Sequence, residues 1–163
     1  MPSKLLFLDI DGVLNDHIPH NNRYCGIKKE CADRFNIVLN SIPDLKIVIS
    51  SAWRYLLLNG QMTISGFESM LMTHGLDIRD RIHGYTSFDV YYKTPETSEE
   101  WSAVGLACRK DQILKYTAEH IVGNWLVIDD LNLKLGYRQI KTDPTIGITQ
   151  TDVEKIIRHF NET

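Results

Sequence analysis

Long apolar runs and paired cysteines are both absent from this sequence of 163 residues. No segment approaches the roughly 20 consecutive apolar residues of a membrane-spanning helix, so we expect no association with a membrane. The three cysteines show no CxxC spacing, and the expected state is therefore reduced thiols in a cytoplasmic protein. Lys4 is followed directly by a short apolar segment that ends in acids, which indicates that there is no signal peptide.

A strong excess of one charge is also absent. Lysine and arginine number 18 and aspartate and glutamate 21, so the net charge is only −3. This balance gives no support for a broad surface that binds nucleic acid or a membrane, although a local basic groove is compatible with it. No repeat, low-complexity tract or linker rich in proline and serine divides the chain. We therefore expect a single domain over residues 1–163 and no obligate protein partner.

The most informative segment is residues 5–15, Leu-Leu-Phe-Leu-Asp-Ile-Asp-Gly-Val-Leu-Asn. Four apolar residues followed by Asp9, Asp11 and Gly12 predict a buried strand that stops at its carboxyl end, where α/β sheets bind ligands. Strand geometry would place the two acids on the same face, where their charges repel unless a cation lies between them. Because oxygen ligands suit magnesium, we hypothesise a magnesium-dependent phosphoryl-transfer site with Asp9 as the nucleophile.

The rest of the sequence alternates between strand and helix patterns. Apolar and β-branched runs predict further strands at residues 45–50, 81–85, 125–128, 137–141 and 145–149. Helical spacing predicts helices at residues 27–41, 53–58, 67–74, 110–120 and 151–160. Thr151 and Glu154 have the spacing of a capping box at the start of the last helix. This alternation predicts an α/β fold, a Rossmann-like three-layer sandwich around a central parallel sheet.

Two segments lack a clear period. Residues 15–26 are polar and are expected to form a loop over the end of the first strand. Residues 86–107 are interpreted as a long surface segment, a candidate lid or substrate-facing loop. The aromatic side chains of Tyr91, Tyr92 and Trp101 could stack on a base or could simply pack. His17 and His20 could form a metal pair or lie in solvent as isolated side chains.

Three predicted strands end in groups that suit a phosphate. The first strand is followed by Asp9 and Asp11, the second by Ser50 and Ser51, and the third by Asp129 and Asp130. In a parallel sheet these ends lie on one edge, and Arg109 and Lys110 precede the third strand. Phosphoryl transfer requires a nucleophile, a metal, hydrogen-bond donors for the phosphoryl oxygens and a proton donor for the leaving group. Each part has a candidate among these residues.

These motifs, in this order, resemble those of the haloacid dehalogenase-like (HAD) hydrolase superfamily. The segment Ser50-Ser-Ala-Trp-Arg54 is similar to one found in a branch of small phosphatases, some of them linked to nucleic-acid repair. The stretch between Asp11 and Ser50 is too short for a separate cap domain at the first insertion point. The resemblance therefore implies a HAD-like fold with a minimal cap or none.

The resemblance also implies a division of roles. Asp9 would attack phosphorus and form an aspartyl-phosphate, while Asp11 would protonate the leaving oxygen and later activate water. Ser50 would donate a hydrogen bond to the phosphoryl group. The implied magnesium ligands are the side chains of Asp9, Asp129 and Asp130 and the main-chain carbonyl of Asp11.

The cation of the third motif stays open between two neighbours. The sequence Arg109-Lys-Asp-Gln-Ile113 resembles the small branch and favours Arg109, whereas the general preference of the superfamily for lysine favours Lys110. Arg54 is either a ligand of a substrate phosphate or a salt-bridged surface residue. Ser51 and Gly12 are further candidates for substrate binding, and Trp53 is expected to belong to the core.

The predicted function is a magnesium-dependent phosphatase that hydrolyses a phosphomonoester. The substrate would be a phosphorylated small molecule, a nucleotide or a nucleic-acid end. A phosphate-binding signalling module or pseudo-enzyme is one alternative, although a receiver-like module would not end its middle strand in Ser50, and a pseudo-enzyme normally lacks the nucleophile. A phosphotransferase that passes the phosphoryl group to an acceptor other than water is another.

Overall fold

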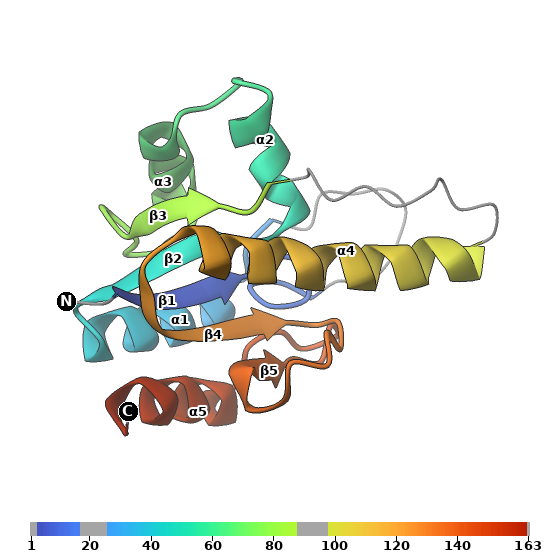
Figure 1. Cartoon of the computed structure of the whole chain (residues 1–163). Helices are drawn as coiled ribbons and strands as arrows, with labels where there is room; N and C mark the ends of the chain where they lie inside the picture. The colour runs from blue at the N-terminus through green and yellow to red at the C-terminus, as the bar shows by residue number, and fades with distance from the viewer. Residues whose placement is uncertain (1–2, 17–25, 88–97, 163) are drawn as a thin grey trace.

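The computed structural model describes residues 3–16, 26–87 and 98–162, without the side chains of Ser3 and of residues 98–107. The described strands form one five-stranded sheet in the order β3-β2-β1-β4-β5 (Figure 1). Every neighbouring pair is parallel. The strands are β1 (Ser3–Leu8), β2 (Leu45–Ile49), β3 (Ile82–Tyr85), β4 (Val122–Asp129) and β5 (Gln139–Lys141). The predicted α/β, Rossmann-like architecture is confirmed.

Helices connect the strands and cover both faces of the sheet (Figure 1). They are α1 (Lys29–Ser41), η1 (Ala52–Arg54), α2 (Tyr55–Leu58), α3 (Ile64–Thr73), α4 (Ser98–Glu119), η2 (Gly136–Arg138) and α5 (Gln150–Asn161). Within the described ranges, no helix is both long and apolar enough to cross a membrane.

The alternation of side chains along β1 divides the core into two clusters. Leu6 and Leu8 belong to the larger cluster, which also contains buried residues of α1, α3 and α5. Leu5 and Phe7 belong to the smaller cluster, where they meet Ile113 and Tyr116 of α4. Because successive residues of a strand point to opposite faces, the odd-numbered positions of β1 face α4.

Three of the predicted elements need correction. Residues 98–107, interpreted as part of a surface loop, form the first half of α4; this segment opens on three polar residues, and Ser102 and Gly105 interrupt its apolar residues, so helical spacing is hidden there. Residues 145–149 form no strand, because Asp143 accepts hydrogen bonds from the backbone and the hydroxyl of Thr145 and closes a turn. The capping box of α5 consists of Thr149 and Asp152, two residues before the predicted pair.

Other predictions fall where the structure gives no description. The pair His17 and His20 lies outside the described residues, and so do Tyr91 and Tyr92. The side chain of Trp101 also lies outside the description. The predicted helix at 53–58 is present as η1 followed by α2.

Candidate active site

The polar residues that follow the strands lie side by side at one edge of the sheet. Backbone hydrogen bonds continue between neighbouring chain segments beyond the strand ends. The amide of Ser50 donates to the carbonyl of Leu8 over 3.0 Å, and the amide of Asp9 donates to that of Ile128 over 3.1 Å. The amide of Thr142 continues the series by donating to the carbonyl of Asp129. The structure therefore brings the ends of β2, β1 and β4 together, as the sequence predicted.

The side-chain alternation directs this edge toward α4. Asp9 continues the row of Leu5 and Phe7, while Ser50 and Asp129 stand two residues after Val48 and Val127 of the same small cluster. An apolar row on the α4 side of the sheet thus becomes a polar row where the strands end. The residues that would contact a phosphate face the helix that carries the basic pair.

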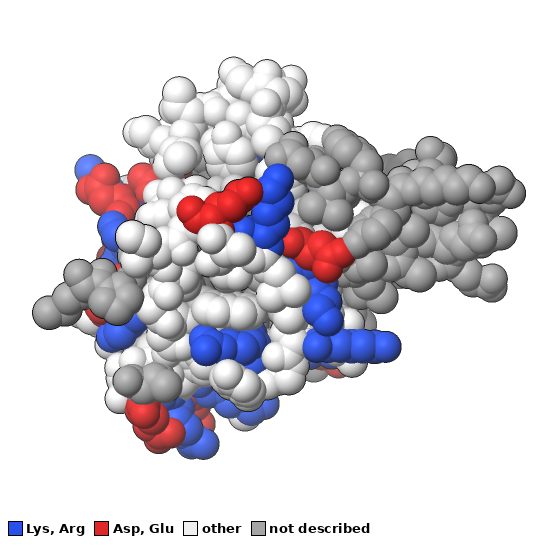
Figure 2. Space-filling model, viewed as in Figure 1, with Lys and Arg blue, Asp and Glu red and all other residues white. Residues whose placement is uncertain are grey.

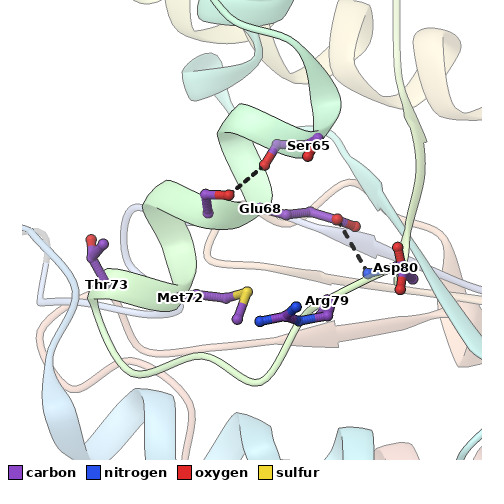
Figure 3. Close-up of a pocket in the computed structure, with 7 residues that line it drawn as sticks. Ser65, Glu68, Met72, Thr73, Arg79 and Asp80 are labelled. Atoms are coloured by element: carbon purple, nitrogen blue, oxygen red, sulfur yellow. Dashed lines mark hydrogen bonds between the residues drawn. The ribbon is translucent and has the colours of Figure 1, made fainter.

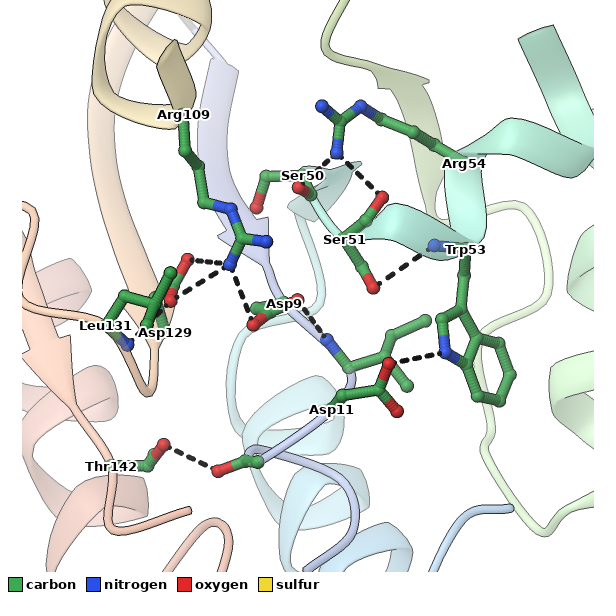
Figure 4. A network of polar contacts seen from close by, with 12 residues as sticks. Asp9, Asp11, Ser50, Ser51, Trp53, Arg54, Arg109, Asp129, Leu131 and Thr142 are labelled. Atoms are coloured by element: carbon green, nitrogen blue, oxygen red, sulfur yellow. Dashed lines mark hydrogen bonds and ion pairs between the residues drawn. The ribbon is translucent and has the colours of Figure 1, made fainter. Parts of the chain in front are cut away.

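Arg109 connects α4 to this polar row (Figure 4). Its Nη1 atom donates to Oδ2 of Asp9 over 3.0 Å and to Oδ1 and Oδ2 of Asp129 over 3.1 and 3.0 Å. Consecutive residues of an α-helix diverge by about 100°. Among the described residues Lys110 forms no ion pair, so the structure brings Arg109 to the acids and not Lys110.

Three carboxylates lie close together at this edge. Oxygen atoms of Asp9, Asp129 and Asp130 all lie within 4.8 Å of one another. Burial raises the pKa of Asp9 to about 7; Arg109 opposes the shift, and the charges of Asp129 and Asp130 add to it. Burial also raises the pKa of Asp129. One guanidinium faces three acids, so this oxygen-only donor set has the excess negative charge that fits a magnesium ion.

Asp11 is separated from this cluster. β1 ends at Leu8, and the backbone turns after Asp11, so the geometry of a continuous strand does not apply to the two acids. The Oδ2 atom of Asp11 accepts from Nε1 of Trp53 over 3.0 Å, and its Oδ1 accepts from Nδ2 of Asn15 over 2.9 Å. The expected side-by-side arrangement of the two carboxylates is therefore wrong, and the Asp11 side chain is not part of the metal-type cluster.

Ser50 lies beside Asp9 with an unused hydroxyl. Its side chain is fully buried, and its Oγ atom has no hydrogen-bond partner among the described residues. Buried polar atoms are almost always paired in folded proteins, so this hydroxyl is available to a ligand bound at the site. A phosphoryl oxygen above Asp9 would supply the partner.

Comparison with known families now identifies the chain. Residues 5–153 match the family described as the HAD domain in Swiss Army Knife RNA repair proteins. The chain belongs to this family. Comparisons with the curated proteins and with the solved structures found no match. The matched range runs from β1 into α5. It contains every residue named above at the carboxyl-end edge of the sheet, which we call the rim.

Arg54 of this HAD domain holds the segment after β2 in place. Its Nη1 donates to the carbonyls of Ser50 and Ser51 over 2.5 and 2.8 Å, and its Nη2 donates to Oε1 of Gln112 over 2.8 Å. The side chain is only 3% exposed, and burial lowers its pKa to about 10. The alternative of a surface salt bridge is therefore wrong, and Arg54 links β2 to α4 three residues from Arg109.

Ser51 and Gly12 occupy structural positions in the site. The Oγ atom of Ser51 accepts from the backbone amide of Trp53 over 3.3 Å, which caps η1. Gly12 has a φ of 77°, and a Cβ atom placed there would lie 2.8 Å from the carboxylate of Asp130. Its carbonyl accepts from Oγ1 of Thr142 over 2.7 Å. The absence of a side chain at residue 12 thus leaves room for Asp130.

Replacing Gly12 by alanine is expected to destabilise the fold by about 1–2 kcal/mol through the left-handed backbone alone. The added methyl group should also displace Asp130 and weaken magnesium binding. Gly60→Ala is the matched control, because Gly60 has a φ of 71° and its Cβ would meet no atom within 4 Å. Thermal unfolding and calorimetric titration with magnesium measure both effects; equal magnesium affinity in the two variants would contradict the role of the clash.

A separate pocket lies away from the rim. It has a volume of about 490 Å³ and lies between α3 and the turn before β3 (Figure 3). Glu68 closes its inner wall by accepting from the amides of Asp80 and Ile82 over 3.2 and 2.9 Å. These contacts fix the amino end of β3, the end of the strand opposite to the rim, so this pocket is not part of the candidate site.

Four residues of the site were not predicted from the sequence. They are Asn15, Trp53, Gln112 and Thr142. Trp53 does pack against the larger core cluster as expected, yet its indole also contacts Asp11. Of the other three, only Asn15 has a local signal in the sequence, because it follows Asp11 by four residues within the same turn. The contacts of Gln112 and Thr142 join distant segments, which no local pattern reports.

Proposed function

We propose that this HAD domain is a magnesium-dependent phosphatase that hydrolyses a phosphomonoester through an aspartyl-phosphate on Asp9. The observation that carries this proposal is the bridge formed by Arg109. Its guanidinium lies 3.0 Å from carboxylate oxygens of both Asp9 and Asp129, next to the hydroxyl of Ser50, which has no hydrogen-bond partner in the described part of the chain. A nucleophile, a cation and a hydrogen-bond donor thus converge on one position at the edge of the sheet.

The residues can carry out the reaction in two steps. In the first, a carboxylate oxygen of Asp9 attacks phosphorus, the bond to the leaving oxygen breaks, and that oxygen takes the proton of Asp11. In the second, Asp11 takes a proton from water as the water oxygen attacks phosphorus, and the bond to Asp9 breaks. Inorganic phosphate leaves and both acids return to their starting states. Arg109 and Ser50 bind the non-bridging oxygens throughout.

The proposed cofactor is a magnesium ion held by Asp9, Asp129 and Asp130. When bound, it would neutralise charge on the phosphoryl oxygens and on the clustered acids. Chelation of divalent cations is expected to lower turnover of p-nitrophenyl phosphate by at least about 100-fold, and added magnesium should restore it. Equal rates with and without the chelator would refute the metal-dependent mechanism. Calcium serves as a control, since it prefers more ligands at longer distances.

The proposed substrate class is the phosphorylated end of a nucleic-acid strand. The description of the family as a domain of RNA repair proteins supports this choice. Figure 2 shows basic and acidic side chains interspersed over the coloured part of the α4 face, without a continuous basic stripe there, which suits contacts confined to a strand end better than binding along a nucleic-acid backbone. The test is a screen of nucleotides, sugar phosphates and oligonucleotides with 3′- or 5′-phosphates. A preference for sugar phosphates would overturn the nucleic-acid assignment while keeping the phosphatase.

The extent of the domain is part of the same proposal. All five described strands belong to one sheet, and α5 packs against the same core cluster as α1. We treat residues 1–163 as a single HAD domain on this basis. Limited proteolysis that released a stable fragment would contradict it.

A further inference from the structure

Trp53 has a contact that its place in the core does not explain. Its ring is half-buried and packs against the larger core cluster, which fixes the plane of the indole. Its Nε1 atom lies 3.0 Å from Oδ2 of Asp11. Figure 4 shows the indole nitrogen directed at this carboxylate. A purely structural tryptophan would not need to place its single donor on the acid of the proposed reaction.

The second oxygen of Asp11 is held from the opposite side. Asn15 is fully buried, and its Nδ2 donates both to Oδ1 of Asp11 and to the carbonyl of Gly26, over 2.9 and 2.8 Å. Its Oδ1 accepts from the amide of Gly12 over 2.9 Å. Asn15 therefore belongs to the turn after β1 that also contains Asp11. Trp53 contacts the acid from η1, in the segment that follows β2.

We propose that Trp53 is a positioning residue for proton transfer by Asp11; this inference rests on the proposed phosphatase function. An indole nitrogen can only donate, and so can the Nδ2 of asparagine. Each carboxyl oxygen has about two lone-pair sites, so one site on each is occupied by these donors. The proton of Asp11 is then confined to the remaining sites, which fixes where it can be delivered.

The segment that contains Trp53 also contains Ser50 and holds it in position. Ser51 caps η1 through the amide of Trp53, and Arg54 holds the carbonyls of Ser50 and Ser51. One short segment therefore sets the distance between the donor for the phosphoryl oxygen and the donor for the proton-transfer acid. This gives the reaction a fixed geometry without requiring any side chain from a cap.

The kinetic test uses leaving groups of different basicity. A nitrophenolate leaves without a proton, whereas an alkoxide requires one from Asp11. Trp53→Phe keeps an aromatic ring at this position and removes the indole N–H donor. The value of kcat/KM for an alkyl phosphate should therefore fall about tenfold or more. For p-nitrophenyl phosphate it should fall by about threefold at most. Trp125→Phe is the matched control, since Trp125 contacts Phe7 and Arg138, and it should leave the ratio of the two values unchanged.

Equal losses on the two substrates would overturn the positioning role, because a structural defect would affect both. A wild-type protein that hydrolyses neither ester would overturn the proposed function and this role with it. A spectroscopic measurement separates failure of the positioning role from failure of the proposed function. The chain has three tryptophans, so an ¹⁵N-edited NMR spectrum should contain three indole cross-peaks, and Trp53→Phe assigns one of them.

Asp11→Ala should shift the Trp53 indole resonance and leave that of Trp125 in place, because the carboxyl acceptor of the Trp53 indole is lost. An unchanged Trp53 resonance would overturn the contact itself, whatever the activity. This measurement uses the native tryptophan, and Trp101→Phe with Trp125→Phe assigns the Trp53 cross-peak by elimination, so it decides the matter even if Trp53→Phe does not fold.

Discussion

The variant Asp9→Asn is expected to hydrolyse a phosphomonoester at least about 10,000-fold more slowly than the wild-type protein. An amide has nearly the same shape as a carboxylate but cannot form an aspartyl-phosphate. Asp9 accepts from the backbone amide of Ile10 through Oδ1, and the amide oxygen of asparagine can keep this hydrogen bond. Phosphate release under saturating magnesium measures the loss.

The fold of this variant should be preserved or stabilised. Burial raises the pKa of Asp9 to about 7, so above that pH the native protein carries a charge that its surroundings disfavour. The neutral amide relieves the repulsion from Asp129 and Asp130 at the cost of the contact with Arg109. Thermal unfolding at pH 8 in the absence of magnesium should therefore give an equal or higher melting temperature. The exposed Asp44, which pairs with Lys4, provides Asp44→Asn as the control. Activity of Asp9→Asn within tenfold of the wild type would remove Asp9 from the role of nucleophile.

Arg109→Ala is expected to lower kcat/KM by about 1,000-fold, while Lys110→Ala should change it by no more than about twofold. The guanidinium of Arg109 reaches Asp9 and Asp129 at once, so its removal leaves both carboxylates and the phosphoryl group without this cation. Lys110 is the matched control because it is the adjacent basic residue of the same helix. Steady-state kinetics on one aryl phosphate compare the two variants.

Arg109→Lys sharpens the comparison. Arg109 contacts both carboxylates through one nitrogen, Nη1, and has further guanidinium nitrogens that can reach a phosphoryl group, whereas lysine has a single nitrogen for all of these contacts. We expect it to recover only part of the lost activity. Equal and mild losses in the two alanine variants would reject Arg109 and Lys110 together, and a larger loss for Lys110→Ala would reverse the assignment.

The sheet could be predicted from the sequence because the patterns that mark its strands are local. Short apolar runs that end in Asp9, Ser50 and Asp129 define three strands, and parallel pairing places their ends on one edge. The choice between Arg109 and Lys110 could not be made in this way. It depends on the rotation of α4 about its axis, which the packing of Ile113 and Tyr116 against the sheet determines.

The errors have physical causes of the same kind. Residues 98–107 showed no helical period because they open on three polar residues and because Ser102 and Gly105 interrupt their apolar residues. Thr149 and Asp152 form the capping box in place of Thr151 and Glu154, since the turn at Asp143 decides where α5 begins. The hydrogen bond from Trp53 to Asp11 spans 42 positions of the chain and has no local signature.

The packing of α4 has an evolutionary consequence. This helix fills the smaller core cluster with Ile113 and Tyr116, and four residues before Ile113 it presents Arg109 to the acids. A change of side-chain volume in that cluster would move the guanidinium as well as the core. Sequence drift on the α4 side of the sheet is thus restricted by chemistry as well as by stability.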